Sequence, residues 1–162
     1  MTPIRVRDVM TNLVVSFRPH DSIREVAGRL LANRISGGPV VSGGKVVGVV
    51  SEADLAGAYG PSTDHNGRIR MADPLAFRLQ ASPAPGWADA TVSEVMTRAV
   101  VTTAPDVEVG EAARLMDRHS VRRLPVVDED GFVCGVIARA DVVRALALQW
   151  AEERETAGTL AR

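Results

Sequence analysis

The spacing of hydrophobic residues along this chain changes between strand-like and helix-like periods, and the same series of changes occurs twice. In each copy a short β-branched run precedes an amphipathic stretch of helical period, two more β-branched runs and a second amphipathic stretch. The helical face of the first copy comprises Ile23, Val26, Ala27, Leu30 and Leu31. The face of the second copy comprises Val109, Ala112, Ala113 and Met116. The pattern therefore predicts two units of strand, helix, hairpin and helix.

The register between the two copies is nearly constant. Met10 and Met96 lie 86 positions apart, whereas Asp54 and Asp141 lie 87 apart, because the first hairpin turn is one residue shorter. A one-residue difference inside a turn is typical of two diverged copies of one supersecondary unit. Two copies are too few for a solenoid, which needs at least three repeats.

Local signals set the ends of the predicted elements. Residues 14–17 read as a strand, and residues 22–25 have the form of a capping box that opens a helix. The β-branched runs between residues 39 and 50 are joined by two glycines, which predicts a hairpin. Residues 51–54 are predicted to cap a second helix. In the second copy the final helix begins near Arg139 and is expected to project beyond the domain body.

These elements predict an α+β fold, with two pseudo-symmetric units packed through their sheets. The predicted boundaries are a first unit at 1–59, a connector at 60–90, a second unit at 91–149 and a helical extension or tail at 150–162. The connector is rich in proline and glycine, with a helical turn conceivable at 74–79. A connector of this length is either functional or disordered.

Composition narrows the class of protein. The 162 residues carry a net charge of −1 and 4% aromatic residues, which favours neither a nucleic-acid backbone nor base stacking. No apolar run is long enough to span a membrane, and no signal peptide is evident. The single cysteine, Cys134, lies in a β-branched run, so we expect a small buried hydrophobic residue. We predict a cytoplasmic protein without disulfides.

The sequence offers little support for catalysis. It contains no phosphate-binding loop pattern and no nucleophile elbow. The three histidines, His20, His65 and His119, have neither metal-ligand spacing nor an evident partner. We therefore predict no enzymatic activity, no catalytic residue and no metal site.

The repeated motifs resemble the cystathionine β-synthase (CBS) domain family, and the duplication resembles a tandem CBS pair of the stand-alone, Bateman-type kind. The resemblance rests on Asp-Val-Met-Thr at 8–11 and Glu-Val-Met-Thr at 94–97, on Pro-Val-Val at 39–41 and 125–127, and on the Gly-Val run before each last helix. No single motif is specific, but the ordered set occurs twice. The resemblance implies two clefts that bind adenine nucleotides or other adenosyl ligands, and pairs that associate into dimers.

Residues 51–54 supply the first candidate site. A carboxylate near a helix start can accept both hydroxyls of a ribose, and free N–H groups there favour phosphate. Ser51 and Asp54 also match a helix capping box, which is a purely structural role. The resemblance favours the ligand role, because the aspartate at this position often contacts ribose in CBS pairs.

The second copy keeps the carboxylate as Asp141 but loses the capping serine. Arg122 and Arg123 replace Ser36 and Gly37, and Arg139 can add to them. Arginines favour phosphate through paired charged hydrogen bonds, although a solvated cluster paired with the acidic hairpin turn is equally plausible. Our hypothesis is that the second site prefers a more phosphorylated ligand than the first.

The remaining predicted nucleotide-binding residues border these positions. The hydroxyls of Ser16, Thr102 and Thr103 lie on the strand that lines the cleft in relatives, although they are also ordinary strand residues. Pro39 and Pro125, which begin the hairpin strands, complete the set.

We thus predict a regulatory module that senses AMP, ADP, ATP or another adenosyl ligand such as S-adenosylmethionine, with no tightly held cofactor. An NAD-type dinucleotide presents the same ribose and adenine. The expected partners are the small molecule, a second copy in a homodimer and an unidentified protein target. The alternative is a ligand-free scaffold that makes contact through Leu146, Leu148 and Trp150 of the last helix.

Overall fold

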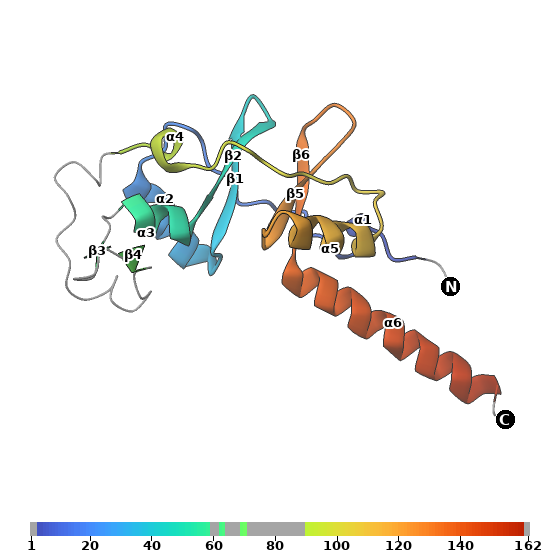
Figure 1. Cartoon of the computed structure of the whole chain (residues 1–162). Coiled ribbons are helices and arrows are strands. Elements are labelled where there is room, and N and C mark those ends of the chain that lie inside the picture. The colour runs from blue at the N-terminus through green and yellow to red at the C-terminus, as the bar shows by residue number, and fades with distance from the viewer. Residues whose placement is uncertain (1–2, 59–61, 64–68, 71–89, 161–162) are drawn as a thin grey trace. The chain divides into compact units, whose positions relative to one another are not determined.

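The computed structural model describes residues 3–58, 62–63, 69–70 and 90–160 (Figure 1). Most of the predicted connector, including the possible helical turn at 74–79, lies outside this range. The chain forms two compact units. The carboxy-terminal unit combines Met1–Val14 with Val101–Arg162, and the central unit is Val15–Val100.

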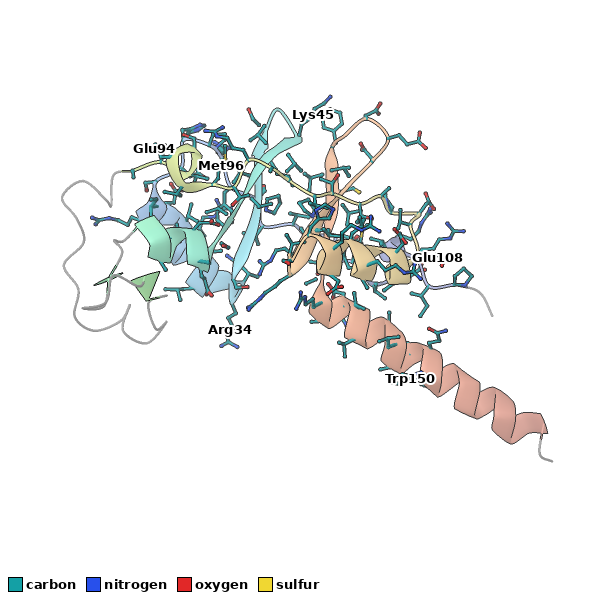
Figure 2. The ribbon with its side chains drawn as sticks, in the orientation of Figure 1. Arg34, Lys45, Glu94, Met96, Glu108 and Trp150 are labelled. Atoms are coloured by element: carbon teal, nitrogen blue, oxygen red, sulfur yellow. The ribbon has the colours of Figure 1, made fainter. Side chains whose placement is uncertain are left out.

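The central unit contains a long antiparallel hairpin, a second, short antiparallel strand pair and helices. Its elements are α2 (Ile23–Asn33), β1 (Gly37–Ser42), β2 (Lys45–Ser51), α3 (Glu52–Ala58), the short pair β3 (Ser62–Thr63) and β4 (Ile69–Arg70), and α4 (Val92–Val95). The turn between β1 and β2 uses Gly43 and Gly44, both with positive φ (57° and 81°), as the sequence predicted. Lys45 follows at the tip of this hairpin (Figure 2).

The carboxy-terminal unit repeats this plan. Its elements are α1 (Val6–Val9), α5 (Val109–Arg118), β5 (Arg123–Val127), β6 (Val133–Ala138) and α6 (Arg139–Leu160). Helix α6 has 22 residues and passes Gly158, so the predicted long final helix is confirmed. The mixed helix and strand class predicted from the repeat is also confirmed. In the part of the chain that the structure describes, no helix combines the length and apolarity needed to cross a membrane.

Each unit is completed by a segment from the other repeat. The segment around α1 belongs to the first repeat but pairs with the second, because Val6 N–H donates to Val107 (2.8 Å) and Thr11 N–H donates to Val136 of β6 (2.9 Å). The central unit has the mirrored contacts, Val92 N–H to Asp21 (2.9 Å) and Thr97 N–H to Val49 of β2 (2.9 Å). The predicted boundaries follow the repeat, whereas the compact units divide the chain after Val14 and Val100.

Each segment that completes a unit from the other repeat carries a methionine, and this methionine covers a glycine of the hairpin. A Cβ atom added to Gly135 would lie 2.5 Å from Met10 Sδ, and one added to Gly48 would lie 2.5 Å from Met96 Sδ. Met96 is buried. The glycines therefore leave room for the methionine side chains, and the two residue types recur together in both copies.

The two hairpins fill the same core space differently. In the central unit Phe17 is fully buried, and a Cβ atom on Gly38 would lie 3.1 Å from its ring. At the equivalent positions the carboxy-terminal unit has Thr103 and the fully buried Leu124. The larger residue of the pair is thus on the extended segment in one unit and on the hairpin in the other, so a large side chain is buried in both.

The strands predicted at 14–17 and 100–103 are reduced to one parallel bridge each. Phe17 N–H donates to Pro39 (2.9 Å) and Val41 N–H donates to Phe17 (2.8 Å). Extension of this ladder would require N–H groups from residues 39 and 19, and both are prolines. Pro125 and Pro105 limit the bridge at Thr103 in the same way.

The first predicted helix needs one correction. Ser22 Oγ accepts from Glu25 N–H (3.2 Å), and Ile23, Val26 and Leu30 are buried as expected. Leu31, however, is 62% exposed. It lies at the edge of the apolar stripe, one turn before the left-handed Arg34 that ends the helix (Figure 2).

We expect Gly135→Ala to lower the free energy of unfolding by about 1–3 kcal/mol, because the added methyl group overpacks the contact with Met10. The cost should be smaller in a Met10→Ala background, which a double-mutant cycle measured by urea denaturation would show. Gly110→Ala is the matched control. Its Cβ atom would meet nothing within 4 Å in α5, so a neutral or stabilising effect is expected. Equal costs of Gly135→Ala in both backgrounds would contradict the packing argument.

Candidate functional site

In the central unit, Ser51 and Asp54 join the end of β2 to the start of α3. Asp54 Oδ2 accepts from Ser51 N–H (2.7 Å) and Ser51 Oγ (2.7 Å), while Asp54 N–H reaches Ser51 Oγ at 3.4 Å. Glu52 N–H donates to Ser36 (3.0 Å). The predicted capping geometry is therefore present. It leaves fewer N–H groups available to a phosphate at this helix start than we expected.

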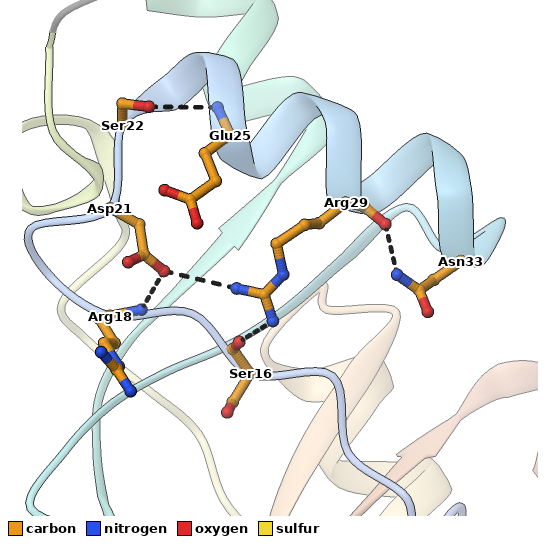
Figure 3. Close-up of polar contacts among 7 residues, drawn as sticks. All are labelled: Ser16, Arg18, Asp21, Ser22, Glu25, Arg29 and Asn33. Atoms are coloured by element: carbon orange, nitrogen blue, oxygen red, sulfur yellow. Dashed lines mark hydrogen bonds and ion pairs between the residues drawn. The ribbon is translucent and has the colours of Figure 1, made fainter.

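The parallel bridge between Phe17 and Val40 of β1 brings Ser16 and Pro39 to the end of the hairpin that carries Ser51. Pro39 is buried, and its carbonyl accepts from the residue after Ser16. The Ser16 carbonyl accepts from Arg29 Nη2 of α2 (2.7 Å), as Figure 3 shows. Hydrogen bonds thus connect the extended segment, β1 and α2, and the half-buried Ser16 side chain is held on a fixed backbone.

Arg29 is a site neighbour that the sequence reasoning missed. Its guanidinium lies 4.7 Å from the centre of the Phe17 ring. It also lies 3.5 Å from Asp21 Oδ2 (Figure 3). Asp21 is buried and also accepts from Arg18 N–H (2.8 Å). The second copy has leucine and valine at the positions of Arg29 and Asp21. A comparison of the two copies would have revealed this difference, since a charged pair replaces an apolar pair.

In the carboxy-terminal unit, Asp141 is in the position equivalent to Asp54. Asp141 Oδ2 accepts from Ala138 N–H (2.8 Å), and its Oδ1 lies 3.0 Å from Arg144 Nη2. Asp141 is 5% exposed, whereas the Arg144 side chain is 60% exposed. The aspartate thus takes over the backbone capping without the serine. The sequence reasoning did not include Arg144, although its spacing of three residues from Asp141 on a helix predicts contact.

The predicted arginines gather near this aspartate. Arg139 N–H donates to the Arg122 carbonyl (3.1 Å), and Arg123 pairs with Ala138 across the hairpin. Arg122 and Arg139 are exposed, and Arg123 is half-buried. The backbone therefore places all three arginine positions at the end of the hairpin that carries Asp141.

Thr102 and Thr103 lie beside the hairpin of β5 and β6, which Thr103 contacts through a parallel bridge to Val126. Thr103 N–H donates to the carbonyl of Pro125 (3.0 Å), which is itself buried, and Thr102 precedes it on the chain as a half-buried residue. Thr103 is 5% exposed, and its Oγ1 has no hydrogen-bond partner among the described residues. An unsatisfied buried hydroxyl is costly, so Thr103 Oγ1 is a candidate polar contact for a ligand.

The other reactive groups do not extend the site. Cys134 is half-buried, and burial, followed by the charge of Asp128, raises the pKa of its thiol. The thiol is therefore a poor nucleophile at neutral pH. Asp128 itself holds the hairpin turn, where its Oδ1 accepts from Phe132 N–H (2.8 Å). Among the described residues no cluster of three metal-ligating side chains occurs, and His65 lies outside them.

We expect Thr103→Val to raise the free energy of unfolding of the ligand-free protein by about 1 kcal/mol, because valine fills the same space without the unsatisfied hydroxyl. Urea denaturation would measure the change. Thr102→Val, at a half-buried position, is the matched control and should stay within about 0.5 kcal/mol of the parent. Destabilisation by Thr103→Val would show that the hydroxyl has a partner in the folded protein.

Comparison with known proteins identifies similar chains. Uncharacterized protein MJ1426 of Methanocaldococcus jannaschii is 31% identical over 155 residues, covering 87% of this chain and 90% of its own length. The solved structure of CBSX2 in complex with AMP is 30% identical, with a TM-score of 0.68 over 91% of this chain and 98% of that one. CBSX2 is from Arabidopsis thaliana.

A second solved structure holds two other adenosyl compounds. It is the CBS domain pair of protein MJ0100 in complex with 5′-methylthioadenosine and S-adenosyl-L-methionine. It is 26% identical, with a TM-score of 0.69 over 91% of this chain and 99% of that one. The family model of the CBS domain matches residues 6–60 and 92–148. The chain therefore belongs to the CBS domain family, with two copies of the domain in tandem.

Proposed function

We propose that this protein is a regulatory module that binds adenosine-containing ligands, with one site in each compact unit. The observation that carries the proposal is the repeated aspartate after each hairpin. Backbone N–H groups fix Asp54 at 2.7 Å and Asp141 at 2.8 Å. The complexes of CBSX2 with AMP and of MJ0100 with adenosyl compounds support the choice of ligand class.

A fixed carboxylate suits the ribose of such a ligand. Each carboxylate oxygen has two lone pairs, so an aspartate that accepts backbone N–H groups can still accept hydroxyl groups from a diol. Because the backbone already orients the side chain, little conformational entropy is lost when the ligand binds. Asp54 and Asp141 are accordingly proposed as the ribose acceptors of the central and carboxy-terminal units.

The surroundings of the two carboxylates favour different ligands. The set proposed for the central unit, Ser16, Pro39 and Ser51 with Asp54, contains no arginine, and its neighbour Arg29 is already bonded to the Ser16 carbonyl and Asp21. The backbone places Arg122, Arg123 and Arg139 at the end of the second hairpin that carries Asp141. Paired N–H donors of guanidinium groups bind phosphate strongly. We propose that the carboxy-terminal unit takes the more phosphorylated ligand, with Thr102, Thr103 and Pro125 bordering it.

Binding can regulate only if the ligand prefers one conformation or assembly over another. The proposal assigns no catalytic step to the chain, so its output passes through a partner that reads the bound state. We propose a homodimer and a protein target as those partners. A cytoplasmic location fits the single cysteine.

Helix α6 supports a second candidate function, a scaffold that associates through its exposed apolar residues. Val143, Leu146 and Trp150 are 65%, 42% and 62% exposed, and their spacing places them on one face of the helix. Figure 2 shows Trp150 on α6. Leu148 is 51% exposed. An apolar stripe of this kind is a typical contact surface between helices. This function does not require an occupied ligand site.

A thermal-unfolding screen against adenosine, AMP, ATP and S-adenosylmethionine tests the proposal. A ligand at about 100 times its dissociation constant adds about 2.7 kcal/mol, which raises the midpoint by about 5–10 °C for a chain of this size. In calorimetric titration, Asp54→Asn and Asp141→Asn should each remove one binding site per chain. The ligand whose site is lost should differ between the two variants. Equal losses for the same ligand would contradict the proposed difference between the sites.

Glu94→Gln is the matched control for loss of a capping carboxylate. Glu94 accepts from Thr91 N–H (2.6 Å) at the start of α4, and hydrogen bonds from the Thr91 N–H and then its hydroxyl lower the pKa of Glu94. This variant weakens a cap outside the proposed sites, so ligand binding should be unchanged. If no adenosyl compound shifts the midpoint of the parent protein, the scaffold function is favoured instead.

A further inference from the structure

Arg144 makes the two aspartates chemically different. Its Nη2 lies 3.0 Å from Asp141 Oδ1, while Ala138 N–H occupies Oδ2 at 2.8 Å. Both oxygens of the carboxylate thus already have donors. In the central unit the backbone N–H and the hydroxyl of Ser51 both donate to Oδ2 of Asp54. The described residues provide no donor to Oδ1 of Asp54.

The difference has a simple origin in the sequence. Residue 57, which is three positions after Asp54, is a glycine, whereas Arg144 is three positions after Asp141. Residues at this spacing on a helix are neighbours, so an arginine reaches the carboxylate and a glycine cannot. A Cβ atom added to Gly57 would meet nothing within 4 Å. Packing therefore does not require a glycine here, and there is room for the Cβ atom of an arginine.

From this geometry we infer that Arg144 is a specificity-determining residue of the carboxy-terminal site, where it competes with the ribose hydroxyls of a ligand for Asp141 Oδ1. The inference rests on the proposed binding of adenosyl ligands. A neutral nucleoside must displace the guanidinium and receives nothing in exchange. A phosphorylated ligand provides the displaced guanidinium with a new anion, so its affinity falls less.

Competition with an ion pair gives an unusual dependence on salt. The Arg144 side chain is 60% exposed, so dissolved ions screen its attraction to Asp141. The hydrogen bonds of a neutral diol are screened less. Raising the salt concentration should therefore strengthen the binding of adenosine at this site, opposite to the usual trend for charged ligands. An arginine that only stabilises α6 would not produce this effect.

Two reciprocal substitutions test the inference by calorimetric titration with adenosine. In an Asp54→Asn background, which isolates the carboxy-terminal site, Arg144→Ala should tighten binding by about two- to fivefold. In an Asp141→Asn background, Gly57→Arg should weaken binding to the central site by a similar factor. The parent carboxy-terminal site should also gain affinity between about 0.05 and 0.5 M NaCl. Arg144→Ala should remove that gain.

Arg114→Ala is the matched control. Arg114 pairs with Glu111 (2.9 Å) at the same spacing in α5 of the same unit, away from Asp141, so its loss should leave adenosine binding unchanged. Unchanged or weaker binding in Arg144→Ala, together with unchanged binding in Gly57→Arg, would overturn the inference while the proposed function stands. If neither adenosine nor AMP binds the parent or any variant, the proposed function itself fails.

Discussion

The packing of a methionine side chain on a hairpin glycine is the constraint on which the rest of this structure depends. Met10 reaches Gly135 and Met96 reaches Gly48, each so closely that a Cβ atom on the glycine would force the methionine side chain to move. Each methionine comes from the repeat that does not contribute the hairpin of its unit. Neither repeat therefore forms its compact unit alone, and the chain must contain both copies to bury either core.

The segment that each unit receives from the other repeat also helps to position the candidate sites. The Thr11 and Thr97 backbones bond to β6 and β2, the strands that lead directly into the helices carrying Asp141 and Asp54. Along the other side of each hairpin, prolines limit the parallel pairing to a single bridge. The backbone carbonyl and N–H groups beyond each bridge are thus left out of a ladder. On the side of Ser16 and Thr102, these groups lie at the end of the hairpin that leads into the helix with the aspartate.

Periodicity predicted the elements well because each buried face repeats in the sequence. The glycine turn, the capping serine of α2 and the long α6 all depend on local chemistry, which a single sequence contains. The pairing of α1 with the second hairpin does not depend on local chemistry. A repeat shows which segments of the two copies are equivalent, but not which segments of different copies contact each other. The strands at 14–17 and 100–103 were overestimated because β-branched residues favour a strand only if a partner strand can donate, and proline cannot.

The candidate sites show the same division between local and spatial information. Asp54 and Asp141 were proposed from a motif, and each carboxylate accepts the backbone N–H of the residue three positions before it. Arg29 and Arg144 were missed because both lie on helices, outside the motifs that marked the candidate sites. Both residues are differences between the copies, where an arginine replaces leucine or glycine. The shared aspartates accept the same backbone N–H group in both copies, whereas Arg144 provides a donor to Oδ1 of Asp141 and the described residues provide none to Oδ1 of Asp54.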